Sequence, residues 1–229
     1  MTEALNFRNS QNEPTLTEKE DRLRELTSAL LAGKSEEAKQ RAYAALAKGN
    51  TERETLDAII EAVDIICDLQ ELDQYEPAKI ASVENAVNSG LQALEEWLAK
   101  SEVKFDAKVI VGPVGLKTGG LSSLALSASL RAVGFRAVNL GKTQTALDLL
   151  RNSEELDADL VIPLLPEKDD EHLRSFTEAY ERGGFKSKFD IIPISPGLSE
   201  NAHANPIIAR NLEEAISKAT QWALKNARG

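Results

Sequence analysis

Along the N-terminal part of the chain, apolar residues recur every three or four positions, which is the spacing of amphipathic helices. Two runs carry this pattern: Leu23, Leu26, Leu30 and Leu31, then Leu56, Ile59, Ile60, Val63 and Ile66. Start and stop signals divide the region into helices that begin near residues 17, 35, 51 and 78, the last of them running to residue 100. Four or five helices with short connections predict an up-and-down bundle.

The predicted helices begin and end at residues that suit those positions. Thr17–Glu20 and Thr51–Glu54 both match the capping box, in which a hydroxyl and a carboxylate accept hydrogen bonds from backbone N–H groups at a helix start. Ser35 is the expected N-cap of the second helix. Gly33 and Gly49 are expected to end the first and second helices.

After Ser101 the pattern changes to short β-branched runs that alternate with helical segments. Strands are predicted at 108–111, 137–140, 159–162 and 189–194, and a short fifth strand at 206–209 is left open. Helices are predicted at 121–133, 145–152, 170–182 and 212–227. This alternation predicts βαβ units, and therefore a doubly wound, Rossmann-like parallel sheet with helices on both faces.

The fold class is therefore α/β with an N-terminal helical bundle. We expect three segments: a flexible arm over 1–14, a helical bundle over 15–101 and an α/β domain over 102–229. Ligands of parallel sheets bind at the carboxyl ends of the strands. The candidate site is therefore expected in the loops that follow the strands, at 112–120, 141–145, 163–170 and 194–205.

The first of these loops, Gly112 to Gly120, is rich in glycine and lies between a strand and a helix. It matches neither the Walker pattern nor G-x-G-x-x-G. Its backbone N–H groups, with the hydroxyls of Ser122 and Ser123, are suited to an anionic group. The alternative is that the glycines only form the turn and that Ser122 caps the helix.

Composition narrows the classes of partner. The 27 Lys and Arg residues against 37 Asp and Glu residues leave a formal charge of −10, which argues against nucleic acid and anionic membrane surfaces. The sequence shows no transmembrane stretch and no signal peptide, so a cytoplasmic location is expected. The one cysteine, Cys67, excludes an intramolecular disulfide and a cysteine zinc cluster, and we expect it to be buried.

The order of these parts resembles the corrinoid proteins of methyltransferase systems, in which a helical cap domain precedes a cobalamin-binding α/β domain. The resemblance covers about residues 16–227. The segments "LLAGKSEEAKQRAYAALAKG" and "LDQYEPAKIASVENAVNSGLQAL" are similar to helix pairs of the cap. The segments "KVIVGPV", "LRAVGFRAVNLG", "ADLVIPLL" and "NLEEAISKA" are similar to the strands and helices of the B12-binding domain.

The family's chemical motifs are altered in this chain. Its Asp-x-His-x-x-Gly signature, whose histidine is the lower cobalt ligand, falls on Lys117, Gly119 and Ser122. The Ser-x-Leu element falls on Pro163–Leu165, which keeps only the leucine, and the Gly-Gly element near 192–195 is absent. The resemblance therefore implies cobalamin or another tetrapyrrole as the cofactor, but it does not support ligation of cobalt by a histidine of this loop.

The residues that we predict to contact a ligand lie in the strand-end loops: Lys117, Thr118, Gly119, Gly120, Ser122, Ser123, Leu165, Ser195 and Gly197. Of the two histidines, His172 is expected to be a solvated surface residue. His203, in the last loop, is a weak candidate for a metal ligand, and no other metal ligand is predicted. No catalytic constellation is found, so a binding or carrier protein is expected rather than an enzyme.

Three hypotheses follow. The first is a corrinoid or tetrapyrrole carrier of a methyl-transfer system that binds its ligand base-on or in another non-standard way. The second is a degenerate relative that binds no cobalamin and acts as a regulator or partner of a methyltransferase. The third is a binder of a small anionic ligand at loop 117–123.

Overall fold

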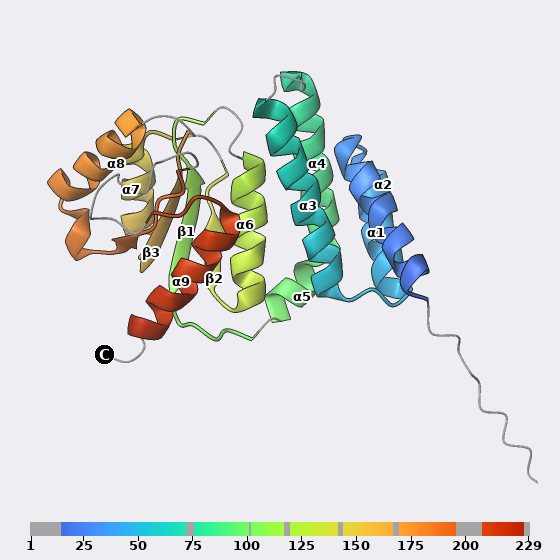
Figure 1. The fold of residues 1–229 in the computed structure, drawn as a ribbon. Coiled ribbons are helices and arrows are strands. Elements are labelled where there is room, and N and C mark those ends of the chain that lie inside the picture. The colour runs from blue at the N-terminus through green and yellow to red at the C-terminus, as the bar shows by residue number, and fades with distance from the viewer. Residues whose placement is uncertain are drawn as a thin grey trace, which may run out of the picture.

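The structure, a computed structural model, describes residues 15–71, 76–100, 102–116, 120–141, 144–166, 170–195 and 208–226. The predicted arm over 1–14 lies outside these residues. The N-terminal part is helical, as predicted, and Figure 1 shows its helices standing side by side. Its elements are α1 (Leu16–Leu31), α2 (Ser35–Ala47), α3 (Glu52–Glu71), α4 (Pro77–Gln92) and the short α5 (Glu95–Lys100).

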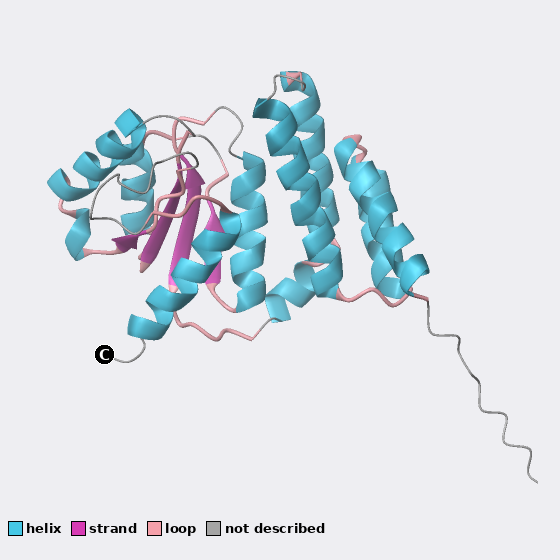
Figure 2. Cartoon of the chain, viewed as in Figure 1, coloured by secondary structure: helices cyan, strands magenta, loops and turns pink. Residues whose placement is uncertain are grey.

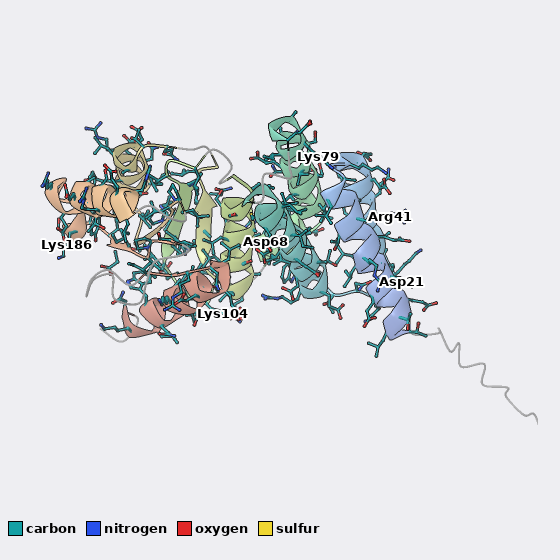
Figure 3. All side chains as sticks on the ribbon, turned by 45° about the horizontal axis from the view of Figure 1, so that its top comes forward. Asp21, Arg41, Asp68, Lys79, Lys104 and Lys186 are labelled. Carbon is teal, nitrogen blue, oxygen red and sulfur yellow. The ribbon has the colours of Figure 1, made fainter. Side chains whose placement is uncertain are left out.

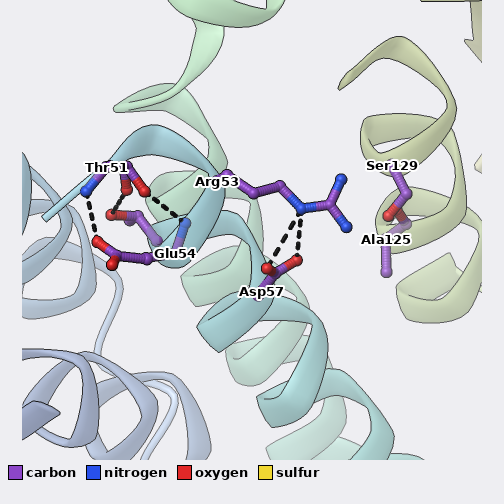
Figure 4. A network of polar contacts seen from close by, with 7 residues as sticks. Thr51, Arg53, Glu54, Asp57, Ala125 and Ser129 are labelled. Carbon is purple, nitrogen blue, oxygen red and sulfur yellow. Dashed lines mark hydrogen bonds and ion pairs between the residues drawn. The ribbon is translucent and has the colours of Figure 1, made fainter. Parts of the chain in front are cut away.

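The predicted N-terminal capping residues are confirmed at one of three helix starts. Thr51 and Glu54 form the predicted box, with hydrogen bonds of 2.7 and 3.1 Å, and Arg53 beside them extends from α3 towards α6 (Figure 4). The box predicted at Thr17–Glu20 is wrong by two residues, because Thr15 and Glu18 have the same spacing and form it instead. Ser35 is the first helical residue of α2 and not its N-cap, which is Lys34.

The C-terminal part is an α/β layer structure (Figure 2). The described residues form a four-stranded, all-parallel sheet of order β2-β1-β3-β4. Its strands are β1 (Lys108–Pro113), β2 (Arg136–Asn139), β3 (Leu160–Leu164) and β4 (Asp190–Ile191). Its helices are α6 (Gly120–Val133), α7 (Ala146–Glu155), α8 (Asp170–Arg182), the 3-10 turn η1 (Phe185–Ser187) and α9 (Leu212–Asn226).

The fourth predicted strand is shorter than expected. β4 itself ends at Ile191. The N–H groups of Ile192 and Ile194 still donate to the carbonyls of Val161 and Pro163 of β3, at 3.0 and 2.9 Å. Beyond β4 the pairing is recorded as single bridges, from Leu164 to Ile194 and from Ile194 to Ala209. The segment predicted at 206–209 is therefore present as a bridge at Ala209, and 206–207 lie outside the described residues.

The helices cover both faces of the sheet, as a doubly wound fold requires. One face packs against α6 and α9, where Leu126, Leu130 and Ala219 are buried with the apolar side chains of β1 and β3. The other face packs against α7 and α8 through residues such as Leu149 and Phe176.

Helix α6 belongs to two cores at once. Its Leu121, Ala125 and Ala128 are buried in the core of the helical bundle, while its Leu126 and Leu130 are buried in the core of the sheet. The bundle therefore packs directly onto α6, which lies between α3 and the sheet (Figure 1). The segment 102–107 runs past the amino ends of the strands, away from the edge where a ligand is expected.

None of the described helices is long and apolar enough to cross a membrane.

Candidate functional site

Buried apolar residues lie at the carboxyl ends of β1 and β3. Val114, Leu164 and Leu165, which follow or end β1 and β3, are all buried. Hydrogen bonds join the segments here, from the Val114 N–H to the Leu164 carbonyl and from the Leu165 N–H to the carbonyl of Ile194, each 2.9 Å long. The predicted contact residue Leu165 and Val114 are buried in the core between the sheet and helices α7 and α8, whereas Leu164 is buried in the core on the α6 and α9 side.

Ser195 lies at the same edge, where the last paired segment ends. Its backbone N–H donates to the carbonyl of Ala209 at 3.0 Å. Its side chain is fully buried, yet the hydroxyl has no hydrogen-bond partner among the groups that the structure describes. A buried hydroxyl without a partner is costly, and in native proteins it commonly marks the place of a bound molecule or water.

The hydroxyls at the start of α6 are already engaged within the protein. Ser123 donates to the carbonyl of Gly120 at 2.9 Å. Ser122 lies 3.3 Å from the sulfur of Cys67 on α3. Cys67 is half-buried rather than fully buried, and it packs against the bundle core. Each of the two hydroxyls therefore already has one contact within the protein, and their predicted contact with a ligand stays a prediction.

A carboxylate from the bundle occupies the start of α6. Glu84 of α4 places Oε1 2.5 Å from the position that a Cβ on Gly120 would take, and the carbonyl of Gly141 lies 3.4 Å from the same position. Three segments therefore converge here: α4, the start of α6 and the loop after β2. A negative charge at a helix N-terminus is favourable, so the carboxylate of Glu84 can itself stabilise the N-terminus of α6. Sequence reasoning did not identify Glu84 as a site residue.

Further acidic groups lie nearby on α3. Asp64 and Asp68 lie within about one turn of Cys67, which touches the start of α6 (Figure 3 labels Asp68). Partial burial raises the pKa of Asp64, and the neighbouring carboxylate of Asp68 raises it further. Of these carboxylates, Glu84 is the one that the structure places at the α6 start.

His172 lies closer to the candidate site than expected. It is half-buried, and its Cδ2 and Nε2 atoms lie 3.0 Å from the position that a Cβ on Gly115 would take. Gly115 belongs to the first strand-end loop and has a φ of 70°, a conformation that favours glycine. The expectation that His172 is merely solvated is wrong, because α8 delivers its ring to this loop.

The predicted contact residues thus fall into three groups. Gly120, Ser122 and Ser123 lie together at the start of α6, and Leu165 and Ser195 lie at the ends of β3 and of the segment after β4. Lys117, Thr118, Gly119, Gly197 and His203 lie outside the described residues. Within the described ranges, no group of three or more His, Cys, Asp or Glu side chains could hold a metal ion.

Comparison with known proteins identifies the fold. No family model and no curated protein sequence matches the chain. Among solved structures, the chain is similar to the monomethylamine corrinoid protein of Methanosarcina barkeri, with a TM-score of 0.64 and 15% identity over 89% of this chain and 99% of that one. The chain therefore has the fold of a helical cap followed by a B12-binding domain, which confirms the predicted fold class.

Two further solved structures are similar but superpose less well. The methanol:cobalamin methyltransferase complex MtaBC of Methanosarcina barkeri gives a TM-score of 0.46 at 15% identity, covering 92% of this chain and 85% of that one. A cobalamin-binding protein of Desulfitobacterium hafniense gives 0.45 at 14% identity, covering 87% of this chain and 98% of that one.

Proposed function

We propose that this chain binds a corrinoid at the carboxyl edge of its sheet, as a carrier protein of a methyl-transfer system. The observation that carries the proposal is the unpartnered, fully buried hydroxyl of Ser195 at that edge, in a chain with the fold of a corrinoid protein. Such a carrier requires a methyltransferase or regulatory protein as its partner.

The described residues fit a corrinoid better than they fit an anionic tetrapyrrole. The carboxylate of Glu84 can accept hydrogen bonds from the neutral amide side chains that surround a corrin ring, whereas it would repel the propionates of a haem. When bound, the corrinoid would supply a cobalt atom that carries the methyl group.

The chain's own residues would position the ligand. Ser195 would donate or accept one hydrogen bond, and Leu165 would contact the ring. Lys117 and Thr118 are proposed to contact it from the first loop. The lower side of cobalt is proposed to keep the corrinoid's own base or water, because Gly119 at the family's histidine position has no side chain.

Titration of the purified protein with hydroxocobalamin tests this proposal. Saturable binding with a change in the visible absorption spectrum supports it, and absence of binding at micromolar protein contradicts it. An electron paramagnetic spectrum of the bound cob(II)alamin form then tests the ligation. Coupling to a protein histidine nitrogen that disappears in a His172→Ala variant would replace the base-on assignment with ligation by His172.

A second candidate is a relative that binds no corrinoid and acts as a regulator or partner of a methyltransferase. The start of α6 favours it, because Glu84, Cys67 and the carbonyl of Gly120 already contact the groups that would face a ligand. A protein that remains colourless with added cobalamin, yet still associates with a methyltransferase, would support this candidate.

Binding of a small anion at loop 117–123 is the third candidate. The described part of this region counts against it, since Glu84 places a negative charge at the α6 start.

A further inference from the structure

A complete cobalamin has two parts that a protein can bind. One is the corrin ring with its neutral amide side chains, and the other is a nucleotide tail made of a phosphate, a sugar and an aromatic base. Burial of the tail requires a gap that admits the base and a site that accepts the phosphate. At the carboxyl ends of the strands, the packing and the charges of the described residues disfavour both.

The layer between the sheet and helices α6 and α9 is filled with side chains. On the sheet, Leu164, Ile192 and Ile194 are at most 3% exposed. The facing side chains of the two helices have no exposed area: Leu126, Leu130, Ala215 and Ala219. A side chain without exposed area borders no space that admits even a water molecule. An aromatic base would therefore have to displace side chains of this core.

The strand ends are also joined sideways by backbone hydrogen bonds. The N–H of Leu165 donates to the carbonyl of Ile194 at 2.9 Å, and the N–H of Ser195 donates to the carbonyl of Ala209 at 3.0 Å. The N–H of Ala209 donates in turn to the carbonyl of Pro193 at 2.8 Å, and Ala209 has no exposed area. The described segment that leads into α9 is therefore paired with the end of the last strand.

The layer between the sheet and helices α7 and α8 is filled as well. Val114 and Leu165 are at most 4% exposed, and Leu149 and Phe176 have no exposed area. The hydroxyl of Ser195 is the one buried side-chain group among the described residues that lacks a hydrogen-bond partner. A single hydroxyl suits one amide of the ring, and it does not provide space for a base.

The helix N-termini at this edge, where proteins commonly bind phosphate, are already matched with carboxylates. Helices α6, α7, α8 and α9 all begin here, because each follows a strand or paired segment of the parallel sheet. The carboxylates are Glu84 at the start of α6, Asp148 in α7, Glu171 in α8 and Glu213 in α9. A phosphate at any of these helix starts would meet a like charge.

On the basis of the proposed function, we propose that the chain recognises the corrin ring alone and leaves the nucleotide tail outside the protein. The contacts to the ring are those of Ser195 and Leu165, and the tail adds none. The ligand class is therefore corrinoids in general, and it includes cobinamide, which lacks the nucleotide. The identity of the lower base is immaterial to binding.

Parallel spectroscopic titrations of the full chain with diaquocobinamide and hydroxocobalamin test the proposal. The two Kd values should agree within about threefold, because both ligands present the same ring and amides. The isolated tail fragment, α-ribazole phosphate, should displace neither ligand. Ser195→Ala should raise both Kd values by the same factor, about two- to tenfold. Ser153→Ala, which removes a buried hydroxyl bonded to the carbonyl of Leu149, is the matched control and should raise neither.

Three results would overturn the proposal and leave the proposed function intact. The first is a Kd for cobalamin that is lower than that for cobinamide by about tenfold or more, since it would show that the chain binds the tail. The second is displacement of bound cobalamin by α-ribazole phosphate. The third is a loss of affinity in Ser195→Ala for cobalamin alone. Absence of binding by both corrinoids would instead contradict the proposed function, and the ring specificity with it.

Discussion

Replacing Ser195 by alanine should change stability and ligand affinity in opposite directions. In the ligand-free protein the substitution removes a buried hydroxyl that has no partner among the described groups. Because only one oxygen atom is removed, the substitution leaves no large cavity. Such an unsatisfied group costs about 1–3 kcal/mol. The free energy of unfolding should rise by up to that amount, which for a chain of this length raises Tm by a few degrees.

The same variant should bind hydroxocobalamin more weakly. Loss of one neutral hydrogen bond to the ligand costs about 0.5–1.5 kcal/mol, which corresponds to about a two- to tenfold increase in Kd. Differential scanning calorimetry of the ligand-free protein measures the first effect, and a spectroscopic titration measures the second.

Ser153→Ala is the matched control. Ser153 is equally buried, but its hydroxyl donates to the carbonyl of Leu149 at 2.7 Å. Its removal should therefore not stabilise the protein. If Ser195→Ala lowers Tm as Ser153→Ala does, the hydroxyl of Ser195 has a partner within the protein. If it leaves the Kd unchanged, Ser195 is not part of the site.

Three other predictions concern the bundle and the surroundings of α6. Leu121→Ala and Leu126→Ala should each lower the free energy of unfolding by about 2–5 kcal/mol, within one shared unfolding transition. Two separate transitions in calorimetry would contradict this. Asp64→Asn should stabilise the protein at neutral pH, because the raised pKa of Asp64 means that its ionised form destabilises the folded state; below about pH 3–4, where Asp64 is protonated, this effect should be lost. Asp57→Asn, which breaks the ion pair with Arg53, should not stabilise the protein. Glu84→Gln should improve haemin binding relative to hydroxocobalamin by about tenfold in parallel titrations, and an unchanged ratio would remove Glu84 from the site.

The fold could be predicted from the sequence because its signals are local. Helical spacing in the bundle and the change to β-branched runs after Ser101 define both parts. The helix predicted at 170–182 has the observed bounds of α8. Local signals were insufficient where two overlapping capping boxes are possible, as at Thr15 and Thr17, and they did not predict that β4 ends at Ile191.

The candidate site could be predicted only in part, because its contacts depend on packing between distant elements. Alternation of strands and helices predicted the carboxyl edge as the site, and the structure places Leu165 and Ser195 at that edge. The contact of Glu84 with Gly120 depends on how α4 packs beside α6, and that of His172 with Gly115 depends on the position of α8. In the sequence Glu84 is an ordinary polar position of an amphipathic helix, and nothing local distinguishes it.

The sharing of α6 between two cores has a consequence for synthesis of the chain. A ribosome completes α1 to α5 before it makes Leu121, Ala125 and Ala128, which close the bundle core. Until α6 emerges, the nascent bundle exposes the apolar surface that these residues later cover, and at that stage it is prone to aggregation and to capture by chaperones. Ribosome stalling just before Gly120 should therefore leave a chaperone-bound, protease-sensitive bundle, whereas stalling far enough beyond Val133 for α6 to emerge should leave a resistant one.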